Sequence, residues 1–171
     1  LATCCDPKSG VLYAVDSGVE RGAPAPGDRE RATGGPRVRR LNLSSGEILK
    51  DRNSSGEAEL VQPQGIALSA DGKTLCVSDA SKHQVFVFEA PSLRFARTLG
   101  RKGSRKGELR SPDGVAIHDG CVYVADVYNH RISVFHLDGG AGAPGLDDKT
   151  IRAVLAPGGF KRSIGLLGSD P

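Results

Sequence analysis

Basic side chains gather in one short, glycine-rich stretch of the chain. The cations are Arg101, Lys102, Arg105, Lys106 and Arg110. A single acid, Glu108, stands among them. Cations at this density can bind the phosphate backbone of a nucleic acid or the acidic surface of a protein. The alternative is a loop whose charges are simply solvated, so both interpretations stay open.

Two further residues with side-chain oxygens could bind a metal ion, and each lies between a proline and a glycine. Gln64 lies between Pro63 and Gly65, and Asp113 occupies the matching place between Pro112 and Gly114. Carboxylate and amide oxygens are ligands for Ca²⁺, although an Asp between Pro and Gly is also ordinary turn chemistry. No Ser-His-Asp, Gly-x-Ser-x-Gly or phosphate-cradling pattern accompanies them. We therefore expect neither a catalytic nucleophile nor a cofactor.

These positions belong to a repeat. Pro63 and Pro112 are 49 residues apart. The other matched pairs, 47 residues apart, are Asp79 with Asp126, His83 with His130, and Phe88 with Phe135. A third, degraded copy is visible at Val11–Asp16, with its next strand delayed to 37–41 by an insertion. Self-similarity at this period indicates a repeat architecture, in which each copy is one structural unit.

Each copy predicts four short strands, because β-branched and aromatic runs alternate with Asp-Gly and Pro-Ser turns. The strands are expected at 65–68, 74–78, 84–88 and 94–99, and at 114–117, 122–126, 131–135 and 150–155. No helical periodicity competes with them. The pattern predicts an all-β chain built from four-stranded β-propeller blades. The expected boundaries are about 1–52 with a loop insertion at 17–36, about 61–99, about 110–156, and the start of a next blade at 157–171.

The intact copy at 107–135 carries a family resemblance. It reads Gly-Glu-Leu-x-x-Pro-x-Gly-Val-Ala, then Val-Tyr-Val-Ala-Asp-x-x-Asn-His-Arg-Ile-x-Val-Phe, and so resembles the NHL repeat. The copy at 56–88 keeps this frame with Lys-His-Gln in place of Asn-His-Arg. Propellers of this family commonly have six blades. The resemblance therefore implies a partial propeller of about three blades, with the rest supplied by missing chain segments or by another chain.

The resemblance also implies roles for residues. In the family, the repeated Asp, His and Arg are mainly structural. Here these residues are Asp79, His83, Asp126, His130 and Arg131. Related amidating lyases hold zinc with a His after the opening proline, which neither Gln64 nor Asp113 supplies. Calcium-dependent lactonases of the gluconolactonase type use Asn or Asp there, which Asp113 fits and Gln64 fits only partly.

An up-and-down blade places particular loops together. The loop after the second strand emerges on the same face as the link to the next blade, so 17–36, 80–83, 127–130 and 100–107 should share one face. The hairpin tips at 71–72 and 119–120, with the loop at 138–145, should lie on the opposite face. We expect Arg131 and three further arginines to lie near the basic stretch, and Tyr128 is the one aromatic residue available for base stacking. The three further arginines are Arg37, Arg39 and Arg40.

Composition narrows the remaining function classes. The net charge of +3 is by itself too small to indicate nucleic-acid binding. The sequence contains no run of 18 apolar residues, the length needed to cross a membrane as a helix. The four cysteines include no Cys-x-x-Cys pair, so we expect free thiols and favour a cytoplasmic location. The sequence predicts a non-catalytic scaffold for a protein partner. RNA binding through the basic face and a calcium-dependent lactonase remain alternatives.

Overall fold

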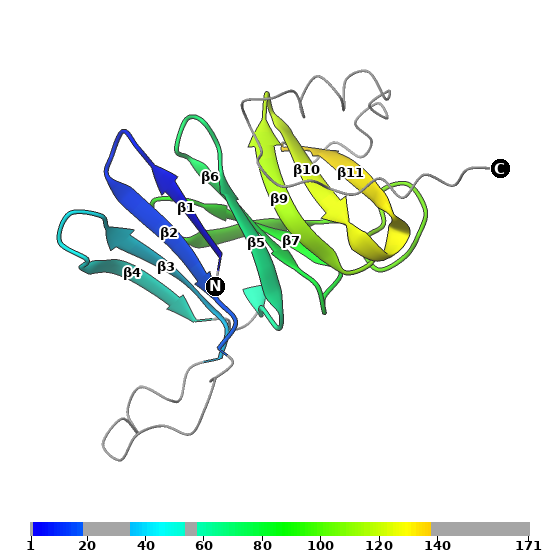
Figure 1. Cartoon of the computed structure of the whole chain (residues 1–171), viewed down its shortest axis with the longest axis horizontal. Helices are drawn as coiled ribbons and strands as arrows, with labels where there is room; N and C mark the ends of the chain where they lie inside the picture. Colours follow the sequence, from blue (N-terminus) through cyan, green and yellow to red (C-terminus); the bar gives the residue numbers. More distant parts are fainter. Residues whose placement is uncertain (1, 19–34, 54–57, 138–171) are drawn as a thin grey trace, which may run out of the picture.

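Three antiparallel sheets make up the computed structural model, which describes residues 2–18, 35–53 and 58–137. Strands β1 to β4 form the first sheet, β5 to β8 the second, and β9 to β11 the third (Figure 1). The first sheet comprises β1 (Ala2–Asp6), β2 (Val11–Asp16), β3 (Arg37–Asn42) and β4 (Ile48–Asn53). The second comprises β5 (Pro63–Leu68), β6 (Thr74–Asp79), β7 (Gln84–Glu89) and β8 (Arg94–Leu99). The third comprises β9 (Pro112–His118), β10 (Cys121–Asp126) and β11 (Arg131–His136).

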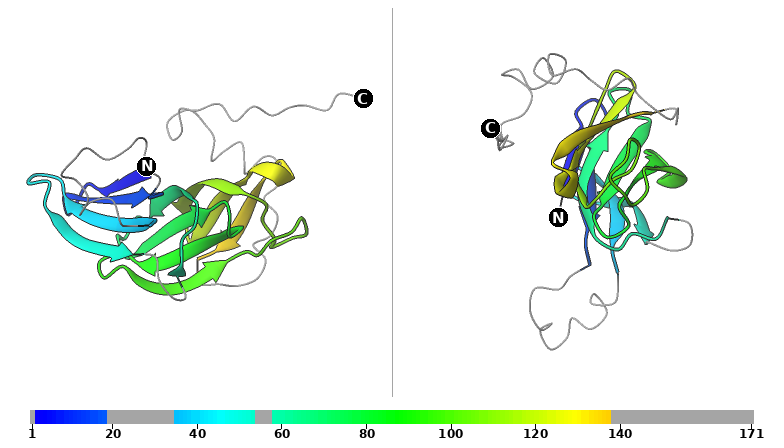
Figure 2. Two further views of the ribbon diagram at one scale, coloured as in Figure 1. Left: turned by 90° about the horizontal axis from the view of Figure 1, so that it is seen from below. Right: turned by 90° about the vertical axis from the view of Figure 1, so that its right-hand side faces the viewer.

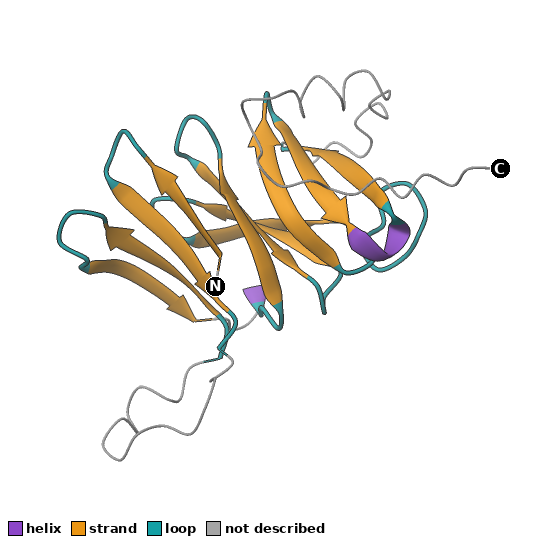
Figure 3. Cartoon of the chain, in the orientation of Figure 1, coloured by secondary structure: helices purple, strands orange, loops and turns teal. Residues whose placement is uncertain are grey.

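Each sheet is a meander in which strands that follow one another in sequence are paired. The register of β6 with β7 runs from Thr74 opposite Glu89 to Asp79 opposite Gln84. That of β10 with β11 runs from Cys121 opposite His136 to Asp126 opposite Arg131, so corresponding positions of the two repeats pair alike. Apart from short helical turns such as η2 (Val127–Asn129), the described residues form strands and loops (Figure 3). None of their helices is long and apolar enough to cross a membrane.

The hydrophobic core lies between neighbouring sheets, with the second sheet in the middle (Figure 2). One cluster joins Val15 and Val38 of the first sheet to Phe88 of the second. The other joins Val87 of the second sheet to Val124 of the third. Because both faces of the second sheet are covered, β6 and β7 are apolar at consecutive positions rather than at alternate ones. Stacking of sheets thus supplies the burial that one sheet alone could not.

Cys76 shows this burial clearly. It is fully buried on β6, at the position that Tyr13 and Tyr123 fill in the neighbouring repeats. Removal from water raises the pKa of its thiol to about 12, because burial penalises the thiolate. Cys76 therefore packs as a small apolar residue, and the four cysteines are free thiols in the structure.

The predicted strands of the second and third repeats are confirmed from 63 to 136, and the first repeat also forms a four-stranded sheet. The strand expected at 150–155, the loop at 138–145, the next blade expected at 157–171 and most of the 17–36 insertion lie outside the described residues.

Candidate functional site

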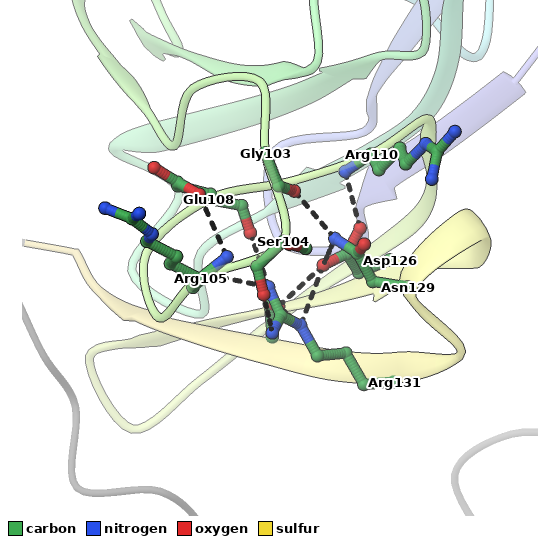
Figure 4. A network of polar contacts seen from close by, with 9 residues as sticks. Gly103, Ser104, Arg105, Glu108, Arg110, Asp126, Asn129 and Arg131 are labelled. Carbon is green, nitrogen blue, oxygen red and sulfur yellow. Dashed lines mark hydrogen bonds and ion pairs between the residues drawn. The ribbon is translucent and has the colours of Figure 1, made fainter.

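Asp126 organises the end of the third sheet. It is fully buried at the last position of β10 and accepts hydrogen bonds from the Arg110 amide at 2.6 Å and from Arg131 Nε at 2.9 Å (Figure 4). Asn129 Nδ2 and Ser133 Oγ donate to the same carboxylate at 2.8 and 3.1 Å. A buried charge is tolerated only when it is compensated in this way. The carboxylate therefore joins the linker before β9 to the loop after β10.

Asp79 does the same at the matching position of the second sheet. Its buried carboxylate accepts the amides of Val61 and Gln62 at 2.6 and 3.0 Å. It also accepts the amides of Ser81 and Lys82 at 3.0 and 2.9 Å. All four donors to Asp79 are backbone groups, whereas Asp126 also holds side chains. The side-chain donors to Asp126 are Asn129, Arg131 and Ser133, and the second repeat has Lys82, Gln84 and Phe86 at these positions.

Arg131 fixes the linker through its main chain. Its guanidinium donates to the carbonyl oxygens of Ser104, Arg105 and Glu108 at 2.8, 2.9 and 2.7 Å, while its Nε faces Asp126 (Figure 4). Asn129 Nδ2 adds a bond to the Gly103 carbonyl at 2.9 Å. Several donors in one planar group suit such a clamp. Arg131 therefore lies at the basic stretch, as expected from the sequence, but its charge is engaged with the protein itself.

The linker also holds its own shape. The Leu109 amide donates to the Arg101 carbonyl at 2.8 Å, and the Gly103 amide donates to the Leu109 carbonyl at 3.0 Å. Leu109 is fully buried and anchors this turn to the core. A Cβ at Gly103 would overlap the Glu108 carboxylate, so the absence of a side chain there leaves room for that group. The linker is therefore a built loop rather than a freely solvated one.

Glu108 is the acid at the centre of this loop. Its Oε2 accepts the Arg105 amide at 2.9 Å and its Oε1 accepts Arg101 Nε at 3.2 Å. The hydrogen bond from the Arg105 amide, reinforced by the Arg101 guanidinium, lowers the pKa of Glu108. The carboxylate thus stays charged at neutral pH and offsets one of the surrounding cations.

The linker cations are exposed, including Arg101 with its bond to Glu108, and they share a surface with Val127 and Tyr128. Val127 and Tyr128 are 47% and 62% exposed, and the Tyr128 amide donates to the Arg110 carbonyl at 3.1 Å. The exposed set, called the linker surface below, is Arg101, Lys102, Arg105, Lys106, Arg110, Val127 and Tyr128. The expectation that 127–130 and 100–107 share a face agrees with these contacts. The sequence reasoning missed Val127, since its apolar side chain carried no signal of exposure.

The three arginines of β3 do not join the linker surface, so that expectation was wrong. They belong to the first sheet, at the other end of the array from the third (Figure 1). Arg37 and Arg39 pair with Asp51 at 3.3 and 3.5 Å, and Arg40 donates to the Pro91 carbonyl at 3.3 Å. Cross-strand partners on β4 and a neighbouring turn therefore take up these charges.

Gln64 and Asp113 lie exposed at the starts of β5 and β9. The main chains of these strands meet there, because Ser78 Oγ accepts the Gly65 amide at 2.8 Å and donates to the Asp113 carbonyl. Within the described residues, no group of three or more His, Cys, Asp or Glu side chains could hold a metal ion. What is built at this place is a junction of two sheets.

The two repeated histidines adopt the same left-handed backbone, with φ of 58° at His83 and 52° at His130. His83 Nδ1 accepts the Ser111 amide at 3.0 Å, which ties the second sheet to the segment entering the third. His130 is exposed and ends η2. The same repeat position is thus a contact between sheets in one copy and a surface residue in the next.

Comparison with known proteins agrees with this architecture. The family model described as NHL repeat matches residues 60–88 and 109–135. A chain of the nidogen/laminin complex is 18% identical over 80% of this chain and 43% of its own length, with a TM-score of 0.54. A chain of Kuenenia stuttgartiensis hydrazine synthase is 17% identical over 80% of this chain and 32% of its own, with a TM-score of 0.57. No curated protein matches significantly by sequence. This chain therefore spans less than half the length of either structure.

Proposed function

We propose that this chain, which carries NHL repeats at 60–88 and 109–135 and forms part of a β-propeller, acts as a non-catalytic scaffold that binds an acidic protein partner through the linker surface. β-Propellers commonly serve as scaffolds for protein interactions. One of the structurally similar chains was itself solved in a nidogen/laminin complex. The observation that carries the proposal is the fixed shape of the linker, whose backbone is held by Arg131, Asn129 and Asp126.

A fixed backbone matters because binding must offset the entropy of ordering the loop. Here the fold has already ordered it, so the exposed cations and Tyr128 are offered at set positions. Electrostatic attraction speeds association. Tyr and Arg are among the residue types most enriched at the interface positions that contribute most of the binding energy. A partner segment with carboxylates beside an apolar residue matches this mixture of charge and exposed Val127 and Tyr128.

RNA is the second candidate for the same cations. Phosphates would be attracted to the linker surface as carboxylates are, but bases need aromatic platforms. Tyr128 is the one exposed aromatic residue in the described part of the chain. This favours a protein partner, and the experiment below separates the two.

Reversing the charge of Lys102 and Lys106, two exposed linker residues, should weaken binding of an acidic peptide about tenfold, since each exposed charge contributes roughly 0.2–1 kcal/mol. Fluorescence anisotropy with a labelled peptide of alternating Glu and Leu would measure this. Lys8→Glu with Lys73→Glu is the matched control, because both lysines are exposed in hairpins of the opposite face. Equal loss in both double variants would contradict the proposal, and tighter binding of a uridine oligonucleotide of equal charge would favour RNA.

The hydrolase alternative has a separate test at Asp113. Calcium takes about six to eight oxygen ligands, and the described residues offer no cluster of acids around this position. Calorimetric titration with Ca²⁺ should therefore give the same heat for the wild type and for Asp113→Ala. A saturable binding signal that Asp113→Ala abolishes would replace the scaffold proposal with a metal site.

A further inference from the structure

Ser104 occupies a distinctive place in the linker. It follows Arg101-Lys102-Gly103 and precedes Arg105-Lys106, so basic residues lie two and three positions before it. Its backbone carbonyl faces inward and accepts Arg131 Nη1 at 2.8 Å (Figure 4). The residue itself is exposed, and no hydrogen bond to its hydroxyl is found among the described residues. The fold thus holds the main chain of Ser104 and leaves its Oγ available.

We propose that Ser104 is a phosphorylation site for a protein kinase that selects basic residues, and that the phosphate weakens partner binding at the linker surface. The second half rests on the proposed function, whereas the first half does not. A kinase groove lined with acids would recognise Arg101 and Lys102 by charge. The modification would therefore be directed by the same cations that it later opposes.

Other serines of the described region fit less well. Ser133 follows Arg131 by two residues, but its hydroxyl donates to the Asp126 carboxylate at 3.1 Å. Ser78 also has a cross-sheet partner and is fully buried. Ser81 is exposed but follows Asp79 and Ala80, so it offers no basic residues upstream. Among these four serines, Ser104 alone is exposed, has a hydroxyl with no hydrogen bond, and has basic residues two and three positions before it.

The reaction needs Mg²⁺ and ATP, which the kinase brings. Ser104 Oγ forms a bond to the γ-phosphorus while the bond from that phosphorus to the bridging oxygen of ADP breaks. The hydroxyl proton passes to the catalytic base of the kinase. The products are phosphoserine and ADP, with no change of oxidation state. At neutral pH the new group carries about −1.5 to −2 charges and three acceptor oxygens.

That charge would change the linker surface directly. Arg101 now pairs with Glu108 at 3.2 Å, so the phosphate would compete with Glu108 for the Arg101 guanidinium. Lys102 and Arg105 are also within the same short loop. Once these cations face a phosphate of their own chain, they attract an acidic partner less strongly. The Arg131 clamp grips backbone carbonyls and does not depend on the Ser104 side chain, so the loop keeps its shape.

Phosphorylation can be tested on the folded 171-residue chain with the catalytic subunit of cyclic-AMP-dependent protein kinase, which selects basic residues upstream of serine. Intact mass and peptide mapping should show phosphate at Ser104, and its loss in Ser104→Ala. Arg101→Gln with Lys102→Gln should slow incorporation about tenfold or more. Ser81→Ala is the control that leaves incorporation unchanged. Absence of phosphate at Ser104 in the folded chain would overturn the proposal.

The effect on binding is read separately with the labelled Glu-Leu peptide. We expect the phosphorylated chain to bind it about three- to tenfold more weakly than the unmodified chain, with the difference shrinking at high salt. Equal affinity of the two forms would overturn the switch. If the unmodified chain fails to bind the peptide at all, the proposed function fails, while phosphate incorporation still decides whether Ser104 is a site.

Discussion

Replacing Asp126 with alanine is expected to destabilise the protein by about 3–5 kcal/mol, because several donors lose a buried acceptor and the partly exposed Arg131 loses its counter-ion. The carboxylate is fully buried and receives four hydrogen bonds, including that of Arg131 Nε at 2.9 Å. Without it, the guanidinium loses its counter-ion and the Arg110 amide loses its acceptor. Both ends of the junction between linker and third sheet are therefore weakened together.

Urea unfolding would measure this loss as a fall in the transition midpoint at constant slope. Asp113→Ala is the matched control, since its exposed side chain should make the substitution neutral to within about 0.5 kcal/mol. Hydrogen exchange adds a local reading, because the Gly103 and Leu109 amides should lose protection in Asp126→Ala. A destabilisation below about 1 kcal/mol would mean that the buried carboxylate is not needed to hold the linker.

Replacing Gly65 with alanine is expected to cost about 3 kcal/mol, at the upper end for overpacking in a core. A Cβ there would lie 2.6 Å from the Asp113 carbonyl oxygen and 3.0 Å from the Val115 amide nitrogen. Both are backbone atoms of β9, so no side-chain rotation can relieve the contact. The second and third sheets would have to move apart at the place where Ser78 joins them.

Gly114 provides an internal control because it is the same repeat position 49 residues later. Among the described residues, a Cβ on Gly114 would meet only the Ala125 Cβ, at 4.0 Å, which is an ordinary contact. Gly114→Ala should thus change the free energy of unfolding by less than about 0.5 kcal/mol, whereas Gly65→Ala lowers it strongly. Thermal unfolding of the two variants side by side would decide this. Similar transition temperatures for both would show that close approach of β9 does not select glycine at 65.

Much of the fold could be predicted from the sequence because the repeat constrains it twice. The matched spacing of Asp79 with Asp126 indicated corresponding strand ends, and the β-branched and aromatic residues at 122–126 indicated a strand. The meander then placed 127–130 beside 100–107 without any knowledge of contacts. Local patterns succeed here because each blade is formed by neighbours in sequence.

The site was less predictable because charge alone does not reveal pairing. Arg37, Arg39 and Arg131 look alike in sequence as cations beside a loop face. In the structure Arg37 and Arg39 pair with Asp51 on an adjacent strand. Arg131 donates to three backbone carbonyl groups as well as to Asp126. Carbonyl acceptors have no signature in the sequence, since every residue carries one. The role of Glu108 as an acceptor was hidden in a similar way, because it receives the backbone amide of Arg105 and backbone amides also have no signature in the sequence.

The Arg131 clamp has a consequence for how this molecule could change. Its three loop contacts are to main-chain oxygens, which survive almost any replacement of the residues that carry them. The exposed side chains at positions 102, 104, 105 and 106 can therefore be substituted while the loop keeps its backbone conformation. Blades of this kind would act as interchangeable display frames, in which new recognition sequences can be grafted or evolved without redesigning the scaffold beneath.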